Sequence, residues 1–145
     1  MTKESSPESH DVEGLFAGTY LEFLGFRLID WQDGFVRLDM TIRPEHRNTV
    51  GYLHGGVIAS LLDISGALAG SYGKSQDSVS VTVNMTTNYL SPLRGETVIV
   101  EAELVRSTKS LFFTQSKLLD PQKSRLCATA TGTYKPRARS AQLPE

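Results

Sequence analysis

The sequence predicts a single α+β domain in which a curved antiparallel sheet wraps around one long central helix. Residues 55–71 form an apolar stretch that indicates a helix, and a helix that is apolar around most of its circumference must be covered on most of it. Two strand-like runs precede this helix and four follow it, rich in β-branched residues and alternating in polarity. A sheet that curls around the helix buries the apolar surface of the helix and the apolar face of the strands together.

The first expected elements are a short helix and a hairpin. Side chains in residues 15–23 recur at three- and four-residue spacing, which predicts a short amphipathic helix ending near Gly25. The pair Asp33-Gly34 is a turn signal, and residues 36–42 alternate between apolar and polar side chains. We therefore expect a hairpin whose second strand is half buried.

Four further strands are expected after the central helix. They occupy residues 78–90, 96–107, 110–120 and 124–135. The segments between them, with the sequences SPLRG, TK and DPQK, are short enough to join antiparallel neighbours.

The length of the chain and its ends predict one domain with two tails. With 145 residues the chain is long enough for one core and too short for two comfortable domains. Both ends are rich in Ser, Pro and charge, so we expect a disordered tail at residues 1–11, a domain at 12–135 and a flexible tail at 136–145. No apolar segment is long enough for a secretory signal or a membrane span, which predicts a cytoplasmic protein without a membrane partner.

Charge and residue usage exclude several function classes. The 15 Lys and Arg residues oppose 16 Asp and Glu residues, so the chain lacks the basic surface that nucleic acid requires. The single cysteine, Cys127, cannot form an internal disulfide, and its place in an alternating strand favours a buried structural thiol. The three histidines, at positions 10, 46 and 54, lack the spacing of a metal site, and the glycines lack the Lys-Ser/Thr pair of a phosphate-binding loop. We therefore expect neither a metal nor a cofactor.

The start of the central helix carries the residues that point to chemistry. Gly55 and Gly56 follow His54 where the helix begins, although glycine costs helix stability. Free N–H groups and the positive end of the helix dipole meet there, and the absence of Cβ atoms lets a ligand oxygen approach, as an oxyanion site requires. Asp63 lies on about the same face of the helix, ~10 Å from Gly56 along the axis. A two-fold dimer could bring the acid of one chain to the glycines of the other.

Each of these residues also has a structural interpretation. The His-Gly-Gly segment can be a tight loop that closes against the sheet. Asp63 can be a solvated or interface-paired carboxylate. His54 can act as a general base, but hydrogen bonds that pin the loop suit it better.

A resemblance to a known family lies in three segments, NTVGYLHGGVIASLLD, SVSVTVNMTTNYLSPLRGE and VEAELVRSTKSLFFTQSKL. Together they resemble the hotdog-fold acyl-CoA thioesterases of the phenylacetate-degradation (PaaI-like) type, over about residues 45–134. The most specific part is Asn, His-Gly-Gly and Asp in fixed spacing. The resemblance implies the hotdog fold, hydrolysis of an acyl-CoA substrate, and a homodimer or a homotetramer of two dimers with active sites at the subunit interface.

The resemblance also implies a role for each motif residue. Gly55 would offer its N–H to the thioester carbonyl, with Asn48 holding that end of the site. Asp63 would arrive from the partner subunit to activate or orient the attacking water, although direct attack by this carboxylate stays open. Thr82 takes the place of the hydroxyl residue that holds this water. Residues 79–86 alternate, so if their apolar face covers the helix of the same chain, Thr82 reaches the site only across the interface or through a bulge.

Further residues are expected to contact the substrate. His54 and Gly56 border the same helix start. The phosphates of coenzyme A favour Arg or Lys, and Arg94, Arg106 and Lys109 lie at strand ends.

Two other functions remain open from the sequence. One is a non-catalytic module that binds acyl-CoA on the same fold, for which tight binding without thiol release would speak. The other is a hotdog enoyl-CoA hydratase or dehydratase, a chemistry that usually needs a His paired with an acid. The sequence leaves the acyl group open between aryl-acyl and medium-chain types.

Overall fold

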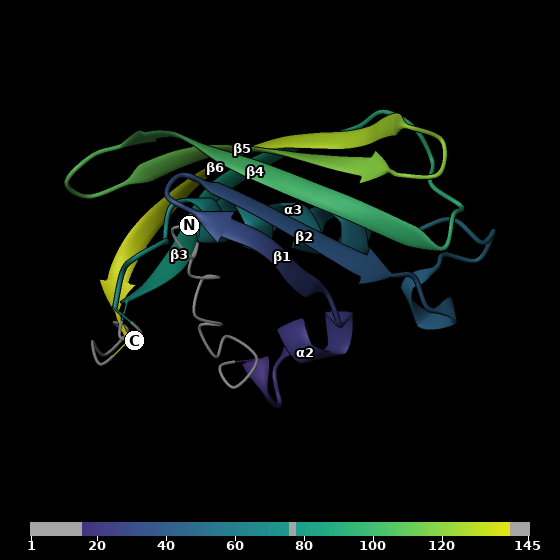
Figure 1. The fold of residues 1–145 in the computed structure, drawn as a ribbon, viewed down its shortest axis with the longest axis horizontal. Coiled ribbons are helices and arrows are strands. Elements are labelled where there is room, and N and C mark those ends of the chain that lie inside the picture. The colour runs from purple at the N-terminus through teal and green to yellow at the C-terminus, as the bar shows by residue number, and fades with distance from the viewer. Residues whose placement is uncertain (1–15, 76–77, 140–145) are drawn as a thin grey trace, which may run out of the picture.

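Six antiparallel strands curve around one long helix in the part of the chain that the structure describes, residues 16–75 and 78–139 of a computed structural model (Figure 1). In chain order the elements are α2 (Tyr20–Leu24), β1 (Arg27–Gln32), β2 (Phe35–Thr41), the 3-10 turn η1 (Pro44–His46), α3 (Gly55–Ala69), β3 (Ser78–Tyr89), β4 (Thr97–Ser107), β5 (Phe112–Asp120) and β6 (Arg125–Ala138). Across the sheet the strands are ordered β1-β2-β4-β5-β6-β3. The predicted α+β class, a curved sheet around a central helix, is confirmed.

Local signals set the ends of both helices. Thr19 begins α2 by accepting a hydrogen bond of 3.2 Å from the Leu21 N–H, and Gly25 ends it in the left-handed conformation, with φ 73°. The predicted end near Gly25 is confirmed. The central helix α3 begins at Gly55, as predicted, and ends at Ala69, slightly before the expected end.

One apolar core fills the space between α3 and the concave face of the sheet. Leu61 and Leu62 of α3 have no exposed surface. The strands turn alternate residues toward them, as a period of two predicts. The inward residues of β2 and β4 are at most 1% exposed: Val36, Leu38, Met40, Val98, Val100 and Ala102. This packing fixes the position of α3, and with it every side chain that the helix presents.

The connection between β3 and β4 differs from the expectation. The short SPLRG segment predicted that these strands are neighbours, but β3 pairs with β6. The segment instead crosses the end of the sheet, where the N–H groups of Leu90 and Ser91 donate to the Cys127 carbonyl of β6. A strongly curved sheet brings strands that are far apart in its order close enough for a short segment to connect them. The TK and DPQK segments do join neighbours, β4 with β5 and β5 with β6.

A bulge in β3 changes which of its side chains face α3. Thr82 pairs with Tyr134 of β6, whereas Asn84 pairs with Thr133, so Val83 is an extra residue in β3. Thr82 lies on the same side of the sheet as α3, because its side chain reaches that helix. The alternating pattern of β3 therefore does not present one apolar face to the helix along its whole length.

One edge of the sheet is formed by β3. Within the described residues no strand pairs with its outer side. Val81 and Val83 on this strand are 41% and 57% exposed. A long edge strand with exposed apolar side chains is suited to pairing with another chain.

The C-terminal strand is longer than expected. β6 continues to Ala138, which pairs with Ser78, so the start of the expected flexible tail belongs to the sheet. The predicted N-terminal tail at 1–11 and the remainder of the C-terminal tail from residue 140 lie outside the described residues.

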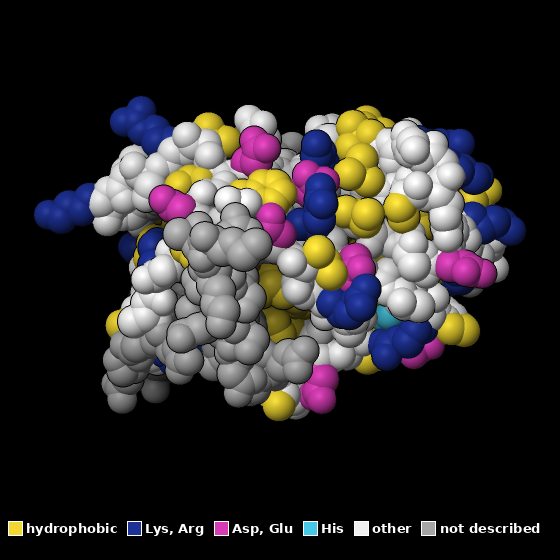
Figure 2. Space-filling model, in the orientation of Figure 1, with side chains coloured by type: hydrophobic (Ala, Val, Ile, Leu, Met, Phe, Trp, Pro, Cys, Tyr) yellow, Lys and Arg dark blue, Asp and Glu magenta, His cyan; other side chains and the backbone are white. Residues whose placement is uncertain are grey.

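Figure 2 shows positive and negative side chains interspersed over one face of the domain, in line with a net charge of -1. Across the two described ranges, no helix combines the length and the hydropathy that a bilayer crossing needs.

Candidate active site

The start of α3 presents one free backbone donor. The His54 ring caps the helix, because its Nδ1 accepts a hydrogen bond of 2.8 Å from the Gly56 N–H. The N–H groups of Val57 and Ile58 donate to the His54 carbonyl. The Gly55 N–H has no hydrogen-bond partner among the described residues, and it lies at the positive end of the helix dipole. The expectation that both glycine amides are open to a ligand is therefore wrong for Gly56, because His54 occupies that amide.

An aromatic side chain from β3 borders this donor. The Tyr89 hydroxyl donates a hydrogen bond of 3.0 Å to the Gly55 carbonyl. A Cβ atom added at Gly55 would lie 3.5 Å from Tyr89 Cε1, so the ring is in contact with the helix start. Tyr89 is 57% exposed, so it borders the start of α3 and still faces solvent.

The side chain of Asn48 shapes the loop that leads to the helix. Its Oδ1 accepts hydrogen bonds of 3.1 Å from the Val50 N–H and 3.0 Å from the Tyr52 N–H. Gly51 permits the tight turn between them with a φ of 90°. Asn48 therefore holds the loop through these backbone N–H groups, and its amide nitrogen has no partner in the described part of the chain.

The three basic candidates lie at different places. Arg94 joins the same loop, since its Nη2 donates a hydrogen bond of 2.8 Å to the Val50 carbonyl and its guanidinium carbon lies 4.5 Å from the Tyr52 ring centroid. Arg106 and Lys109 lie at and beyond the end of β4, at the opposite end of α3 from Gly55. One chain does not bring these two residues to the helix mouth.

The second half of the site is an acid held by a hydroxyl. Asp63, in the middle of α3, accepts a hydrogen bond of 2.8 Å at Oδ1 from the Thr82 hydroxyl of β3. The bulge at Val83 is what places this hydroxyl on the helix side of the strand. Asp63 is half buried, and the pair lies beside the open edge of the sheet. A carboxylate in such a position has a second oxygen with which to bind water.

The two halves are separated within one chain. Asp63 follows Gly55 by eight residues, which is ~12 Å along a helix. A single small reacting group cannot contact both at that distance. That donor and acid come from different chains stays a prediction.

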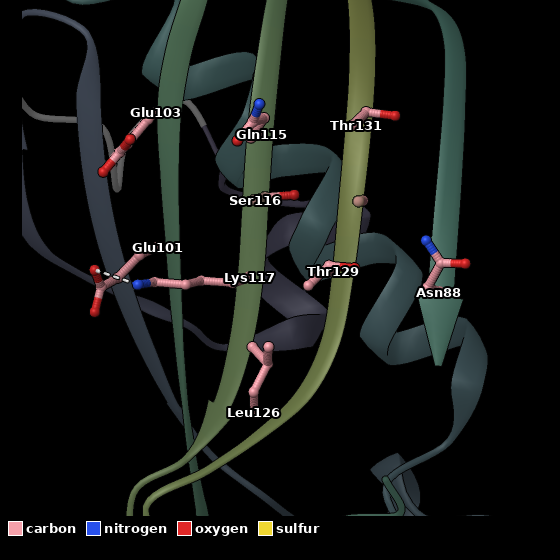
Figure 3. Close-up of a pocket in the computed structure, with 10 residues that line it drawn as sticks. Asn88, Glu101, Glu103, Gln115, Ser116, Lys117, Leu126, Thr129 and Thr131 are labelled. Atoms are coloured by element: carbon pink, nitrogen blue, oxygen red, sulfur yellow. Dashed lines mark ion pairs between the residues drawn. The ribbon is translucent and has the colours of Figure 1, made fainter. Parts of the chain in front are cut away.

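A groove of about 400 Å³ lies on the opposite, convex face of the sheet (Figure 3). Its walls are mostly polar side chains of β4, β5 and β6, and they include Glu101 and Lys117, which form an ion pair at 4.0 Å. None of the predicted site residues lines it. In the described ranges, no three His, Cys, Asp or Glu side chains gather closely enough to hold a metal ion.

Comparison with known proteins assigns the family. The model of the Thioesterase superfamily matches residues 50–127, more than half of the chain, including the His-Gly-Gly segment, Asp63 and Thr82. The chain belongs to the thioesterase superfamily. It is 31% identical to "Acyl-coenzyme A thioesterase 13" from Homo sapiens over 107 residues, which cover 73% of this chain and 76% of that protein.

Solved structures of other thioesterases share the fold. A thioesterase from Haemophilus influenzae aligns with a TM-score of 0.82 over 98% of this chain and 99% of its own, at 20% identity. A thioesterase family protein from Silicibacter pomeroyi aligns with a TM-score of 0.78 over 88% and 96%, at 25% identity. The hotdog fold implied by the sequence is confirmed.

Two residues that border the candidate site were not predicted from the sequence. Tyr89 borders Gly55, and the Tyr134 hydroxyl of β6 donates a hydrogen bond to the main-chain carbonyl of Asp63. In the sequence both are ordinary aromatic residues of alternating strands. Their positions follow from the pairing of β3 with β6, which the chain order does not reveal.

Proposed function

We propose that this thioesterase hydrolyses an aryl-acyl or medium-chain acyl-CoA to the free acid and coenzyme A. The observation that carries the proposal is the Thr82–Asp63 hydrogen bond together with a free amide at Gly55. The Asp63 carboxylate held by Thr82 can bind and deprotonate a water. The Gly55 N–H can donate a hydrogen bond to the oxygen on which negative charge develops. The assignment of the chain to the thioesterase superfamily supports this chemistry.

In the proposed reaction the Gly55 N–H binds the thioester carbonyl oxygen. A donor fixed in advance lowers the barrier by about 3 kcal/mol in comparable sites. Asp63 takes a proton from water as the water oxygen bonds to the carbonyl carbon. The tetrahedral intermediate then collapses, the C–S bond breaks, and the thiolate leaves with the proton returned by Asp63. Thr82 donates to one carboxylate oxygen throughout, which leaves the other free for the water.

The proposed active unit is a dimer joined along the β3 edges. Thr82 and Tyr89 both belong to β3. Thr82 lies beside Asp63 of α3, and Tyr89 lies beside Gly55 at the start of that helix. If two copies of β3 pair antiparallel around a two-fold axis near Met85 and Thr86, Thr82 of one chain faces the partner's Tyr89. Asp63 of one chain then approaches the partner's Gly55. The exposed Val81 and Val83 would be covered in the same step.

The coenzyme A end of the substrate would pass the loop held by Arg94. Its guanidinium lies over Tyr52 and has donors beyond the one given to the Val50 carbonyl. Arg106 and Lys109 stay proposed phosphate contacts that a partner chain would have to supply. Membership of the PaaI-like type, a cytoplasmic location and a tetramer of two dimers belong to the same proposal.

The proposal is tested by measuring release of free thiol from a panel of aryl-acyl and straight-chain acyl-CoA substrates. The wild-type protein should release thiol, and Asp63→Asn should reduce kcat by at least about 100-fold while the melting temperature is kept. Tight binding of acyl-CoA without thiol release by the wild type would favour a binding module instead. Unchanged turnover by Asp63→Asn would refute the assigned acid.

A further inference from the structure

Tyr134 is a buried phenol attached to the backbone of the acid. Only 1% of its surface is exposed, and its hydroxyl donates a hydrogen bond of 3.0 Å to the main-chain carbonyl of Asp63. The Thr114 side chain, which is itself 2% exposed, lies close to the same hydroxyl, since both oxygens would touch a Cβ atom placed at Gly66. Burial, together with the Asp63 charge, raises the pKa of Tyr134, so the hydroxyl keeps its proton and stays a donor.

The strand register places Tyr134 next to the pair formed by Thr82 and Asp63. Thr82 of β3 and Tyr134 of β6 are direct partners across the ladder, and directly opposed residues share one face of a sheet. Thr82 holds the carboxylate of Asp63, and Tyr134 holds the carbonyl of the same residue. Asp63 is thus fixed at two points by two neighbouring residues of one ladder.

Close packing leaves the Tyr134 ring one position. The ring stacks on Phe112, with 5.3 Å between centroids and 18° between planes. A Cβ atom at Gly66 would overlap the Tyr134 hydroxyl, and a Cβ atom at Gly132 would lie 2.6 Å from its Cε2. Both glycines make room for a hydroxyl that reaches the helix backbone at Asp63.

We propose that Tyr134 is a positioning residue that fixes the separation between α3 and the bulged part of β3, and so keeps the Asp63 carboxylate on the Thr82 hydroxyl. This role rests on the proposed hydrolysis. It assigns to the β6 strand a function in the reaction that neither the His-Gly-Gly segment nor the helical acid reveals. In the proposed reaction Tyr134 touches neither water nor substrate and acts only through Asp63.

The test is Tyr134→Phe, which removes the hydroxyl and keeps the ring. Because a small misplacement of a reacting group is costly, kcat for thioester hydrolysis should fall about 10-fold with KM unchanged. The matched control is Trp31→Phe, since the Trp31 indole N–H donates a hydrogen bond of 2.8 Å to the Leu68 carbonyl of the same helix. This control should lower the melting temperature by a similar amount and change kcat by less than about 2-fold. Equal losses of kcat in both variants would show general support of the helix and overturn the proposal.

A double-mutant cycle with Thr82→Val makes the test specific. If Tyr134 acts by keeping Asp63 on Thr82, Tyr134→Phe should cost less than about 2-fold once Thr82 has lost its hydroxyl. A full and independent loss in that background would overturn the proposal. Thr114→Val removes the hydroxyl that lies close to the Tyr134 hydroxyl and should lower kcat in the same direction, so the role is testable even if Tyr134→Phe does not fold.

The failure of this role can be told apart from the failure of the proposed function. A wild-type protein that releases no thiol from any acyl-CoA in the panel would overturn both. Wild-type activity that Asp63→Asn abolishes and Tyr134→Phe leaves intact would overturn the positioning role alone.

Discussion

The Thr82 hydroxyl and the Asp63 carboxylate form a hydrogen bond of 2.8 Å within one chain. The acid half of the candidate site is therefore complete in a single chain, whereas the free amide of Gly55 lies two turns of helix away. In a dimer, the partner chain would need to add only its Gly55 amide at the start of its α3. This division explains why the bulge in β3 matters, because without it Thr82 would face away from the helix.

Loss of the Thr82 hydroxyl should weaken catalysis and leave the fold intact. Thr82→Val keeps the shape of a β-branched residue on an exposed part of β3 and should lower kcat about 10- to 100-fold, because Asp63 loses the group that orients it. Thr82→Ser retains a hydroxyl and is the matched control, with activity close to wild type. Steady-state thiol release measures both, and equal activity of the valine and wild-type proteins would contradict the role of Thr82.

The Gly55 amide can be removed with little change in backbone conformation. Proline is well accepted at the first position of a helix and lacks the N–H, and His54 before it has φ -63° and ψ 137°, which suit a residue that precedes proline. Gly55→Pro should therefore fold and lose about 100-fold in kcat. Gly55→Ala keeps the amide, and its Cβ would lie in ordinary contact with Tyr89, so it should retain most activity. Comparable activity of the proline and alanine variants would exclude the amide as the oxyanion donor.

Stability should fall on acidification because of His46. This ring is fully buried, and burial together with the Arg43 charge lowers the pKa of His46 below its ordinary 6.5. The unfolded chain then binds a proton at this ring at higher pH than the folded chain does. The contribution of the neutral ring to the free energy of unfolding is therefore fully present above pH 6.5, and it is lost as the pH falls toward the lowered pKa of His46. Melting curves from about pH 7.5 to about pH 5.5 should show a decline. His46→Gln should show a shallower decline, and an unchanged slope would assign the effect to other groups.

Features encoded by local pattern could be predicted from the sequence. The Asp33-Gly34 turn, the alternation in β2 and the apolar stretch of α3 each depend on residues close together in the chain. The His-Gly-Gly start and Asp63 were found for the same reason, since their spacing along one helix is fixed.

Features that depend on distant contacts could not be predicted. The SPLRG segment is short, yet it joins strands that do not pair, because the curvature of the whole sheet decides which ends meet. The bulge at Val83 leaves no trace in the alternation of β3. Tyr134 acquires its contact with Asp63 only through the β3–β6 register and through the space left by Gly66.

We propose that each active site takes its acid from one chain and its amide donor from another. Mixed dimers of two inactive variants, Asp63→Asn and Gly55→Pro, test this division of the site. A mixed dimer would contain one site with both defects and one intact site, so random reassembly of equal amounts should restore about a quarter of wild-type activity. Mixtures that stay as inactive as the two separate variants, although mass analysis shows that mixed dimers have formed, would contradict a shared site.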